Sequence, residues 1–315
     1  MKLLRLFAVF AIIGILSLTA CSQISTTSTT ATTSSTTANS VISVTDDIGR
    51  TVVIKGAVHR IISLSPSNTE IVYALGLQDE LVGVTSYDDY PADAKTKTVV
   101  SDYSTVDMEK IVNAQPDLVL ADSIRQHDTV PALEKLGISV YVMTPDNLEM
   151  ICSDLKTLGQ ITGKTKEASA LVAGMQARIK AVIDITAKLT DAQKPRVLFV
   201  TWHDPIWTAG SDTMIQYLIN DAGGINIAAD LKGYATITLE SVVQRNPQII
   251  VVMSSMGDQH SSLNYIKSNP QFASTDAVKN GQVVEIDADI FGRTTPRIVD
   301  GLETLTKILH PELFK

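Results

Sequence analysis

Six aromatic side chains stand at or near the ends of apolar runs, where loops are expected: Tyr87, Tyr90, Tyr103, Trp202, Trp207 and Tyr234. Broad, flat rings on loops suit a ligand that is itself a large and partly apolar ring system, because they stack on it and cover its apolar area. Packing inside a core explains any one of them equally well. The set as a whole therefore predicts a binding site for a ring-shaped ligand.

No motif for covalent or metal chemistry accompanies these aromatics. Segment 159–165 resembles a phosphate-binding loop, but Leu158 stands where the first glycine is required. No serine lies in a G-x-S-x-G turn. The histidines lack paired spacing, which argues against a histidine zinc site. They are His59, His127, His203, His260 and His310.

The balance of charge argues against nucleic acid as a partner. The 315 residues include 26 Lys or Arg and 34 Asp or Glu, a net charge of −8. Binding to phosphate backbones requires clustered positive charge. Hydrophobic residues make up 44% of the chain, which is enough to build packed cores. The only two cysteines, Cys21 and Cys152, cannot form a disulfide framework.

The first 40 residues are predicted to export and anchor the chain. Residues 1–20 have the layout of a secretory signal, with a positive start, an apolar stretch and small residues at the end. Residues 18–21 (LTAC) match the bacterial lipoprotein signal, in which the chain is cut before Cys21 and its sulfur is acylated. The rest of segment 21–40 is mostly Ser and Thr and behaves as a flexible tether. We expect an extracytoplasmic protein that is lipid-anchored to the cell membrane.

Short apolar runs alternate with helical patterns from residue 41 onward. The runs lie at 61–64, 81–84, 118–121, 140–143, 197–201, 249–253 and 283–286. Strands that are apolar on both faces are typical of parallel sheets covered by helices. Segments 41–44 and 51–54 are instead predicted to form a hairpin, with Gly49 in its turn.

One long helix divides these elements into two groups. Apolar residues recur at spacings of three and four between 165 and 190, without proline, which predicts a single amphipathic helix. We therefore predict an α/β fold with two Rossmann-like lobes, 41–162 and 193–315, whose sheets are mainly parallel. A backbone helix within 163–192 joins the lobes, and the ligand cleft lies between them.

The two halves repeat one pattern. Segment 107–120 aligns without gaps to segment 238–251, which places Glu109 and Glu240 at equivalent positions. In each copy a capping residue begins a short helix, proline ends it and an apolar strand follows. An acid in the first turn complements the helix dipole. That effect explains each acid separately but does not explain their shared register.

Residues 41–315 resemble a known family, the substrate-binding lipoproteins of ABC importers with a helical backbone, which carry cobalamin, ferric siderophores or haem. The first hairpin and strand of that family are similar to segments 46–50 (DDIGR) and 60–70 (RIISLSPSNTE). Its cobalamin-binding branch is most similar in segments 65–70 (SPSNTE), 86–91 (SYDDYP) and 291–297 (FGRTTPR).

The resemblance implies which residues cradle a corrin ring. Pro66 and Tyr87 have the identity typical of the branch. Tyr103, Trp207 and Tyr234 keep a flat ring where the branch more often has a different aromatic residue. The changes in ring size leave the exact corrinoid open.

The polar residues implied by the resemblance fall into two groups. Asp289 and Arg293 match residues that reach amide or phosphate groups at the ligand edge, with an exposed ion pair at helical spacing as the alternative. Glu109 and Glu240 match the acids, one from each lobe, that dock on basic pockets of the importer. His203 is a further candidate, as a contact to cobalt; no other metal ligand is expected.

The function implied is binding without catalysis. The chain would capture cobalamin or a related corrinoid and deliver it to the membrane permease of an ABC importer, with no cofactor of its own. Its partners would be the corrinoid, the permease and the membrane, reached through the lipid on Cys21, and the chain would be a monomer. A ferric siderophore or haem binder of the same family is the first alternative. An extracytoplasmic enzyme that modifies a tetrapyrrole is the second, although no nucleophile paired with a base supports it.

Overall fold

The computed structural model describes residues 41–102, 105–125, 127–254 and 260–314. The predicted signal peptide (1–20), Cys21 and the tether (21–40) lie outside these residues, and so does Tyr103. None of the helices that the structure describes is both long and apolar enough to cross a membrane.

A hairpin begins the described chain, as predicted. Its strands β1 (Val41–Thr45) and β2 (Thr51–Lys55) pair antiparallel. Gly49 adopts the positive φ of 79° that the turn requires and donates its N–H to the carbonyl oxygen of Asp46. Side chains alternate between buried and exposed along β2, so one face of the hairpin packs on the core.

The first lobe contains a five-stranded sheet with the order β5-β4-β3-β6-β7, in which every pairing is parallel. Its strands are β3 (Ile61–Ser63), β4 (Leu81–Thr85), β5 (Val99–Ser101), β6 (Leu118–Ala121) and β7 (Val140–Val142). Its helices are α1 (Pro66–Ala74), α2 (Met108–Asn113) and α3 (Thr129–Lys135), with 3-10 turns η1 (Ala92–Thr96) and η2 (Ser123–Arg125). All residues of β3, β6 and β7 are buried, which confirms the predicted parallel sheet.

The second lobe contains a sheet with the order β11-β9-β8-β12-β13, and β10 pairs with β8. Its strands are β8 (Arg196–His203), β9 (Ile206–Ala209), β10 (Ile225–Asn226), β11 (Tyr234–Thr236), β12 (Ile249–Met253) and β13 (Val283–Ile286). Its helices are α6 (Met214–Asp221), α7 (Leu239–Arg245), α8 (Ser261–Ser268), α9 (Asp276–Lys279), α10 (Ala288–Gly292) and α11 (Ile298–Leu309), with 3-10 turns η3 (Asp191–Gln193), η4 (Pro270–Ser274) and η5 (Pro311–Phe314). The pairings of β8, β10, β12 and β13 are parallel, whereas β9 and β11 add an antiparallel edge that the sequence did not predict.

Helix α5 (Thr165–Thr186) follows α4 (Leu148–Ile161) and leads into the second lobe. The predicted long helix is therefore confirmed, but it ends four residues before position 190. Thr186 donates its hydroxyl to the carbonyl oxygen of Asp221, and Thr190 already begins a capping box for the next turn. Two mainly parallel sheets and one long helix confirm the predicted fold class.

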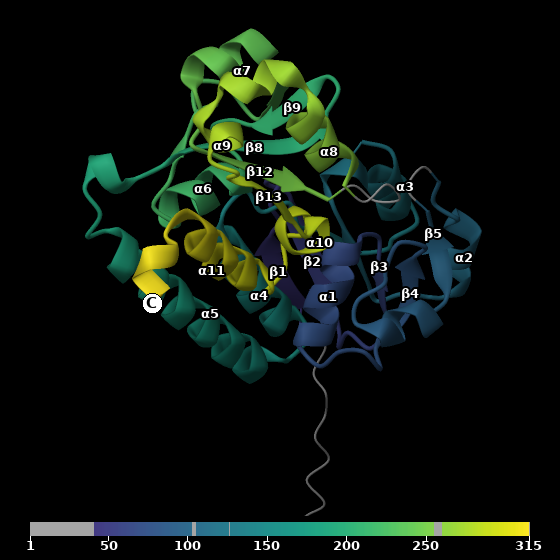
Figure 1. Ribbon diagram of the computed structural model, residues 1–315. Helices are drawn as coiled ribbons and strands as arrows, with labels where there is room; N and C mark the ends of the chain where they lie inside the picture. Colours follow the sequence, from purple (N-terminus) through teal and green to yellow (C-terminus); the bar gives the residue numbers. More distant parts are fainter. Residues whose placement is uncertain (1–40, 103–104, 126, 255–259, 315) are drawn as a thin grey trace, which may run out of the picture. The chain divides into compact units, whose positions relative to one another are not determined.

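Helix α11 lies alongside α5 in Figure 1. Arg178 of α5 forms ion pairs with Asp300 and Glu303 of α11, at 2.5 and 2.8 Å. The connecting helix is thus attached to the second lobe along its side, and not only through the chain that leaves its end.

A buried carboxyl group joins the hairpin to α4. Asp154 of α4 is 2% exposed, accepts a hydrogen bond from the Tyr141 hydroxyl at 3.0 Å and lies against Asp47 of the hairpin turn. Burial and the Asp47 carboxylate raise the pKa of Asp154 to about 8. The Oδ2 atom of Asp154 is buried and has no hydrogen-bond partner among the described residues, so nothing there compensates the ionised form for its loss of solvent.

Asp154→Asn should weaken the pH dependence of stability. The pKa of Asp154 is raised from 3.8 to about 8 in the folded protein. Its contribution to stability is therefore complete below about pH 4 and is lost as the pH rises through 8. The amide of the variant keeps one donor and one acceptor, so its free energy of unfolding, measured by urea titration, should fall less than that of the wild type between pH 6 and 9. The exposed Asp184→Asn is the control, and equal losses in both variants would contradict the assignment.

Candidate functional site

The carboxyl ends of both parallel sheets line one cavity of about 470 Å³. Residues that follow β3, β4, β5 and β6 contribute from the first lobe, and residues that follow β12 and β13 contribute from the second. Small molecules bind at this edge of α/β sheets, and the volume falls within the range of ligand pockets. Four of the predicted ligand residues lie in this lining together: Pro66, Tyr87, Asp289 and Arg293.

The start of α1 fixes Pro66 on the cavity wall. Ser65 is the N-cap, and its side chain accepts a hydrogen bond from the backbone N–H of Asn68 at 3.4 Å. Pro66 occupies the first helical position, where its missing N–H costs nothing. The Asn68 amide donates to the carbonyl oxygen of Ala121 at 3.1 Å, which ties this turn to the end of β6.

A buried carboxylate holds the loop that carries Tyr87. Asp88 is 4% exposed and accepts hydrogen bonds from the hydroxyls of Thr69 and Thr85, each at 2.5 Å. Burial raises the pKa of Asp88, and these hydrogen bonds counter part of the rise. The loop is thereby fixed to both α1 and β4, and it presents Tyr87 and Asp89 on its exposed side.

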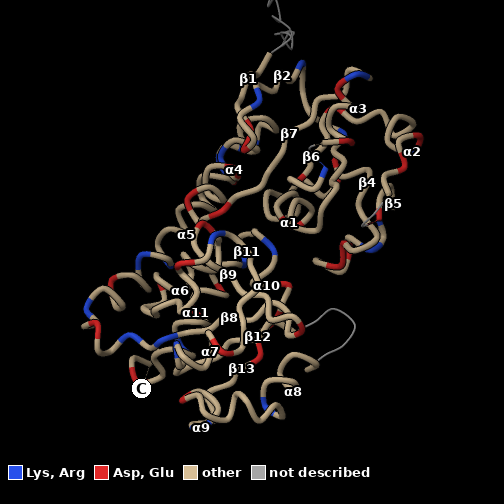
Figure 2. The backbone as a smooth tube through the Cα atoms, turned by 90° about the horizontal axis from the view of Figure 1, so that it is seen from above, with Lys and Arg blue, Asp and Glu red and all other residues tan. Residues whose placement is uncertain are grey.

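A second buried carboxylate connects the two lobes. Glu70 of α1 accepts hydrogen bonds from Arg293 at 2.9 Å and from Nη2 and Nε of Arg297 at 2.5 and 2.8 Å. The Glu70 side chain is only 2% exposed. Figure 2 shows α10, which precedes Arg293, close to α1 of the first lobe. We call Glu70, Arg293 and Arg297 the interlobe cluster.

Arg293 is shared among three carboxylates. Besides Glu70 it contacts Asp89 at 2.7 Å and Asp289 at 2.9 Å. Burial acts to lower the pKa of Arg293, but the bonds from Asp89 and Glu70 outweigh it and the pKa is raised. Burial also raises the pKa of Asp289, and Arg293 counters part of that rise. The Asp289–Arg293 pair therefore exists at helical spacing, but Arg293 is buried in it and bound to the other lobe.

Arg297, the third member of the interlobe cluster, also packs on an aromatic ring. Its guanidinium carbon lies 3.9 Å from the centroid of the Tyr90 ring. The bond to Glu70 raises the pKa of Arg297, against the opposing effect of burial. A cation over a ring face adds about 0.5–1 kcal/mol at exposed sites and more when desolvated. Tyr90 thus belongs to the contact between the lobes.

The predicted aromatics of the second lobe lie outside the cavity lining, on neighbouring strands. Trp202 of β8 pairs with Trp207 of β9, which in turn pairs with Thr236 of β11. Tyr234, two residues before Thr236, therefore faces the same side as both tryptophans. Their side chains are 40–53% exposed. We call Trp202, Trp207 and Tyr234 the aromatic face; it begins directly after Thr201, which lines the cavity.

Tyr234 also comes close to the first lobe. Although about half of its side chain is exposed, neighbouring groups desolvate its hydroxyl. This burial and the Asp146 carboxylate, located between β7 and α4, raise the pKa of Tyr234. The aromatic face belongs to the second lobe, and through Tyr234 it also comes close to the first lobe.

His203 is not among the residues that line the cavity. Its Nδ1 lies 2.9 Å from the Ser262 hydroxyl, and its ring packs against Trp202 and Tyr265 at centroid distances of 4.7 and 5.0 Å. These contacts account for its position at the end of β8 without a metal.

Glu109 and Glu240 are exposed at equivalent positions of the repeat. Each is the second residue of a short helix, α2 or α7, whose N-cap side chain accepts a backbone hydrogen bond. Each helix is followed by a residue with a φ of 45°, Gln115 in one copy and Asn246 in the other. The repeat read from the sequence thus extends to the backbone conformation.

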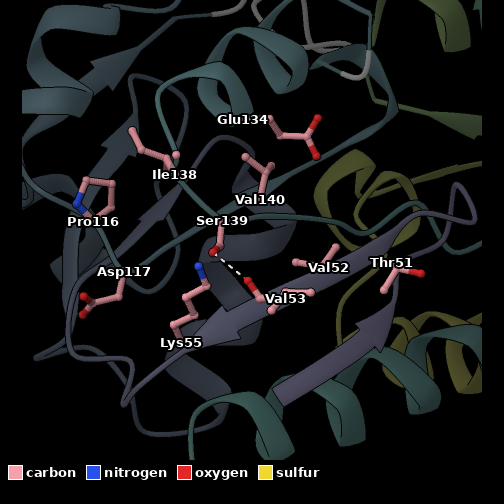
Figure 3. A pocket seen from close by; sticks show the side chains of 11 residues that line it. Thr51, Val52, Val53, Lys55, Pro116, Asp117, Glu134, Ile138, Ser139 and Val140 are labelled. Carbon is pink, nitrogen blue, oxygen red and sulfur yellow. Dashed lines mark hydrogen bonds between the residues drawn. The ribbon is translucent and has the colours of Figure 1, made fainter. Parts of the chain in front are cut away.

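A second hollow of about 430 Å³ lies between β2 and β7 of the first lobe. Figure 3 shows its side chains spread around the opening, with the Ser139 hydroxyl bonded to the carbonyl oxygen of Val53 at 3.1 Å. Asp117 already accepts backbone hydrogen bonds, and Glu134 is paired with Arg50. These polar groups do not converge on a common point, so this hollow is a weaker candidate than the cavity.

Several cavity and interlobe residues were not predicted: Glu70, Asp89, Asp122, Arg125 and Arg297. Glu70 offered one weak signal, because it is an acid directly before the apolar run 71–73. Its partners are 223 and 227 positions away in the chain, so no local pattern identifies the pairing.

Comparison with known proteins agrees with this architecture. A family model described as periplasmic binding protein matches residues 61–290. An ABC transporter substrate-binding lipoprotein of Bacillus subtilis is 31% identical over 279 residues, which cover 87% of this chain and 87% of that protein. The similarity therefore extends over both lobes.

Two solved structures with different ligands in their descriptions are similar to nearly the same degree. The periplasmic vitamin B12 binding protein of Vibrio cholerae is 28% identical with a TM-score of 0.68, over 82% of this chain and 99% of that one. A periplasmic heme binding protein from Pseudomonas aeruginosa is 27% identical with a TM-score of 0.72, over 81% of this chain and 93% of that one. Similarity of this degree does not decide between the two ligands.

Glu70→Gln should destabilise the protein far more than the loss of a surface ion pair. The change leaves two arginines side by side without their shared carboxylate, and breaking a buried pair costs about 3–5 kcal/mol. Glu303→Gln, which removes a partly exposed partner of Arg178, is the matched control and should cost at most about 1 kcal/mol. The comparison is the free energy of unfolding from urea titrations. Equal small losses would show that the interlobe cluster does not hold the lobes.

Proposed function

The chain belongs to the periplasmic binding protein family, and on this premise we propose that it is the extracytoplasmic solute-binding component of an ABC importer that captures cobalamin or a related corrinoid. It passes the ligand to a membrane permease. Members of the family are substrate-binding transport proteins, so the expectation that the chain is not an enzyme is confirmed.

The observation that carries the corrinoid assignment is a tyrosine in the lining of the cavity together with a group of exposed aromatic rings on the strands beside it. Tyr87 lines the cavity from the first lobe, and the aromatic face follows Thr201 in the second. Such rings stack on an extended macrocycle and cover its apolar area. Pro66 adds a rigid apolar contact, and Tyr103 takes part by resemblance to the cobalamin-binding branch.

The ion pairs of Arg293 and Arg297 make these two residues poor partners for the carboxylates of haem or of an anionic ferric siderophore, which is the second candidate. Haem carries carboxylates that are best bound by arginines with free donors. Arg293 already contacts three carboxylates, and both Nε and Nη2 of Arg297 contact Glu70. Asp289 and the shared Arg293 are better suited to the neutral amide groups at a corrin edge, whose NH₂ donates to a carboxylate and whose carbonyl oxygen accepts from a guanidinium.

The organisation of the chain follows from the same proposal. Residues 1–20 direct export, Cys21 carries the lipid, and residues 21–40 tether the body to the membrane. The body consists of an N-terminal lobe (41–162), a connecting helix (163–192) and a C-terminal lobe (193–315). The Bacillus subtilis relative, described as a lipoprotein, supports the anchor.

Trp207→Ala should weaken cobalamin binding. Cyanocobalamin is expected to bind with one-to-one stoichiometry in a calorimetric titration, and loss of the ring removes more than about 1 kcal/mol, since aromatic contacts add 0.5–1.5 kcal/mol beyond the area they bury. Tyr217→Ala is the matched control, because Tyr217 has the same 40% exposure but lies on α6. Tight binding of a ferric siderophore together with no heat from cobalamin would overturn the assignment.

Replacing both Glu109 and Glu240 with alanine should impair transport without changing ligand affinity. The two exposed carboxylates sit on equivalent helices, one per lobe, and would set the docking register on basic pockets of the permease. Transport is measured in vesicles with reconstituted importer, beside a ligand titration. Glu167→Ala, an exposed acid in the first turn of α5, controls for the helix dipole. Normal transport by the double variant would leave only the dipole explanation.

A further inference from the structure

Arg125 is a buried cation on the wall of the cavity. It ends the 3-10 turn η2 directly after β6, lines the cavity and is 9% exposed. Side chains of arginine are rarely this buried unless their charge is paired. Its environment therefore needs an explanation.

The donors of Arg125 are only partly used. Nη2 donates to the carbonyl oxygen of Asp102 at 2.7 Å and to the Ser101 hydroxyl at 3.3 Å. Nε is buried and has no hydrogen-bond partner within the described part of the chain. No described carboxylate forms a salt bridge with Arg125 either. A buried donor without an acceptor is costly, and native proteins keep few of them.

The other arginine on the cavity wall differs from Arg125. Arg293 is held by Glu70, Asp89 and Asp289. Among the cations that the described residues place on this wall, Arg125 is thus the one without a carboxylate in a salt bridge.

A second feature of the same wall favours negative charge. The first turn of α1, with Ser65, Pro66 and Ser67, lines the cavity together with Arg125. The N-terminal end of a helix carries partial positive charge. At α1 this charge is the favourable contribution, because Pro66 has no N–H and Ser65 accepts the hydrogen bond of the Asn68 N–H. Asp122 opposes this field, but burial raises the pKa of Asp122, and Arg125 counters part of that rise. Guanidinium donors and a helix start together suit an anionic oxygen group.

We infer that Arg125 binds an anionic oxygen group of the ligand through the donors that the protein leaves unused. This inference rests on the proposed function. In a complete corrinoid the group is the phosphodiester of the nucleotide loop. In haem or a ferric siderophore it is a carboxylate or another oxyanion, so the same residue would serve either ligand.

Arg125→Gln tests the inference with two corrinoids that differ in this group. Cyanocobalamin contains the phosphodiester, whereas dicyanocobinamide lacks the nucleotide loop. A hydrogen bond to a charged group contributes about 1.5–3 kcal/mol, so the variant should bind cyanocobalamin about tenfold or more weakly. It should bind dicyanocobinamide within about twofold of the wild-type affinity. Arg60→Gln, an exposed arginine that precedes β3, is the matched control and should change neither.

The outcomes separate the inference from the proposed function. Equal weakening of both corrinoids, or no weakening of cyanocobalamin, would overturn the role of Arg125. If corrinoids fail to bind wild-type protein but haem binds it and is weakened by Arg125→Gln, the corrinoid assignment fails while the role of Arg125 stands. If the glutamine variant does not fold, Arg125→Lys keeps the charge without the Nε donor. It should weaken cyanocobalamin several-fold more than dicyanocobinamide, and equal affinities would again overturn the inference.

Discussion

The contact of one carboxylate with two guanidinium groups across the lobes is the constraint on which the binding site depends. Glu70 is almost fully buried and receives Arg293 and Arg297 from the other lobe. Charges taken out of water stabilise a protein only when every partner is in place. The cluster therefore demands one relative placement of α1 and α10, and that placement brings the carboxyl ends of the two sheets to a common cavity.

Two neighbouring features make the same cavity selective. Arg293 forms ion pairs with three carboxylates. The sequence predicts Arg293 as a ligand contact, but in the structure it also joins the two lobes. Arg125 lacks such partners among the described residues and retains free donors. The cavity wall therefore has two regions. Near α10 the charge of Arg293 is neutralised by carboxylates, whereas near α1 the charge of Arg125 is available to a ligand. The aromatic face adds exposed apolar area beside the cavity.

Much of the architecture could be predicted because it follows from local patterns. The sequence shows a turn glycine at Gly49, apolar runs in the buried strands and apolar residues at helical spacing in the long helix. Each of these patterns involves residues that are close together in the chain. The predicted length of α5 was wrong at its end, because the contact of Thr186 with Asp221 depends on the fold of a later segment. The antiparallel edge formed by β9 and β11 was missed for the same reason.

The candidate site was less accessible from the sequence, because its key contacts join residues more than 200 positions apart. Family motifs identified Pro66, Tyr87, Asp289 and Arg293, which share the cavity. The direct test of the account is competition: protein incubated with equal amounts of cobalamin, haem and a ferric siderophore, then freed of unbound ligand, is examined by visible absorption. The account predicts the spectrum of bound corrinoid. A spectrum dominated by haem or by the ferric chelate would contradict it.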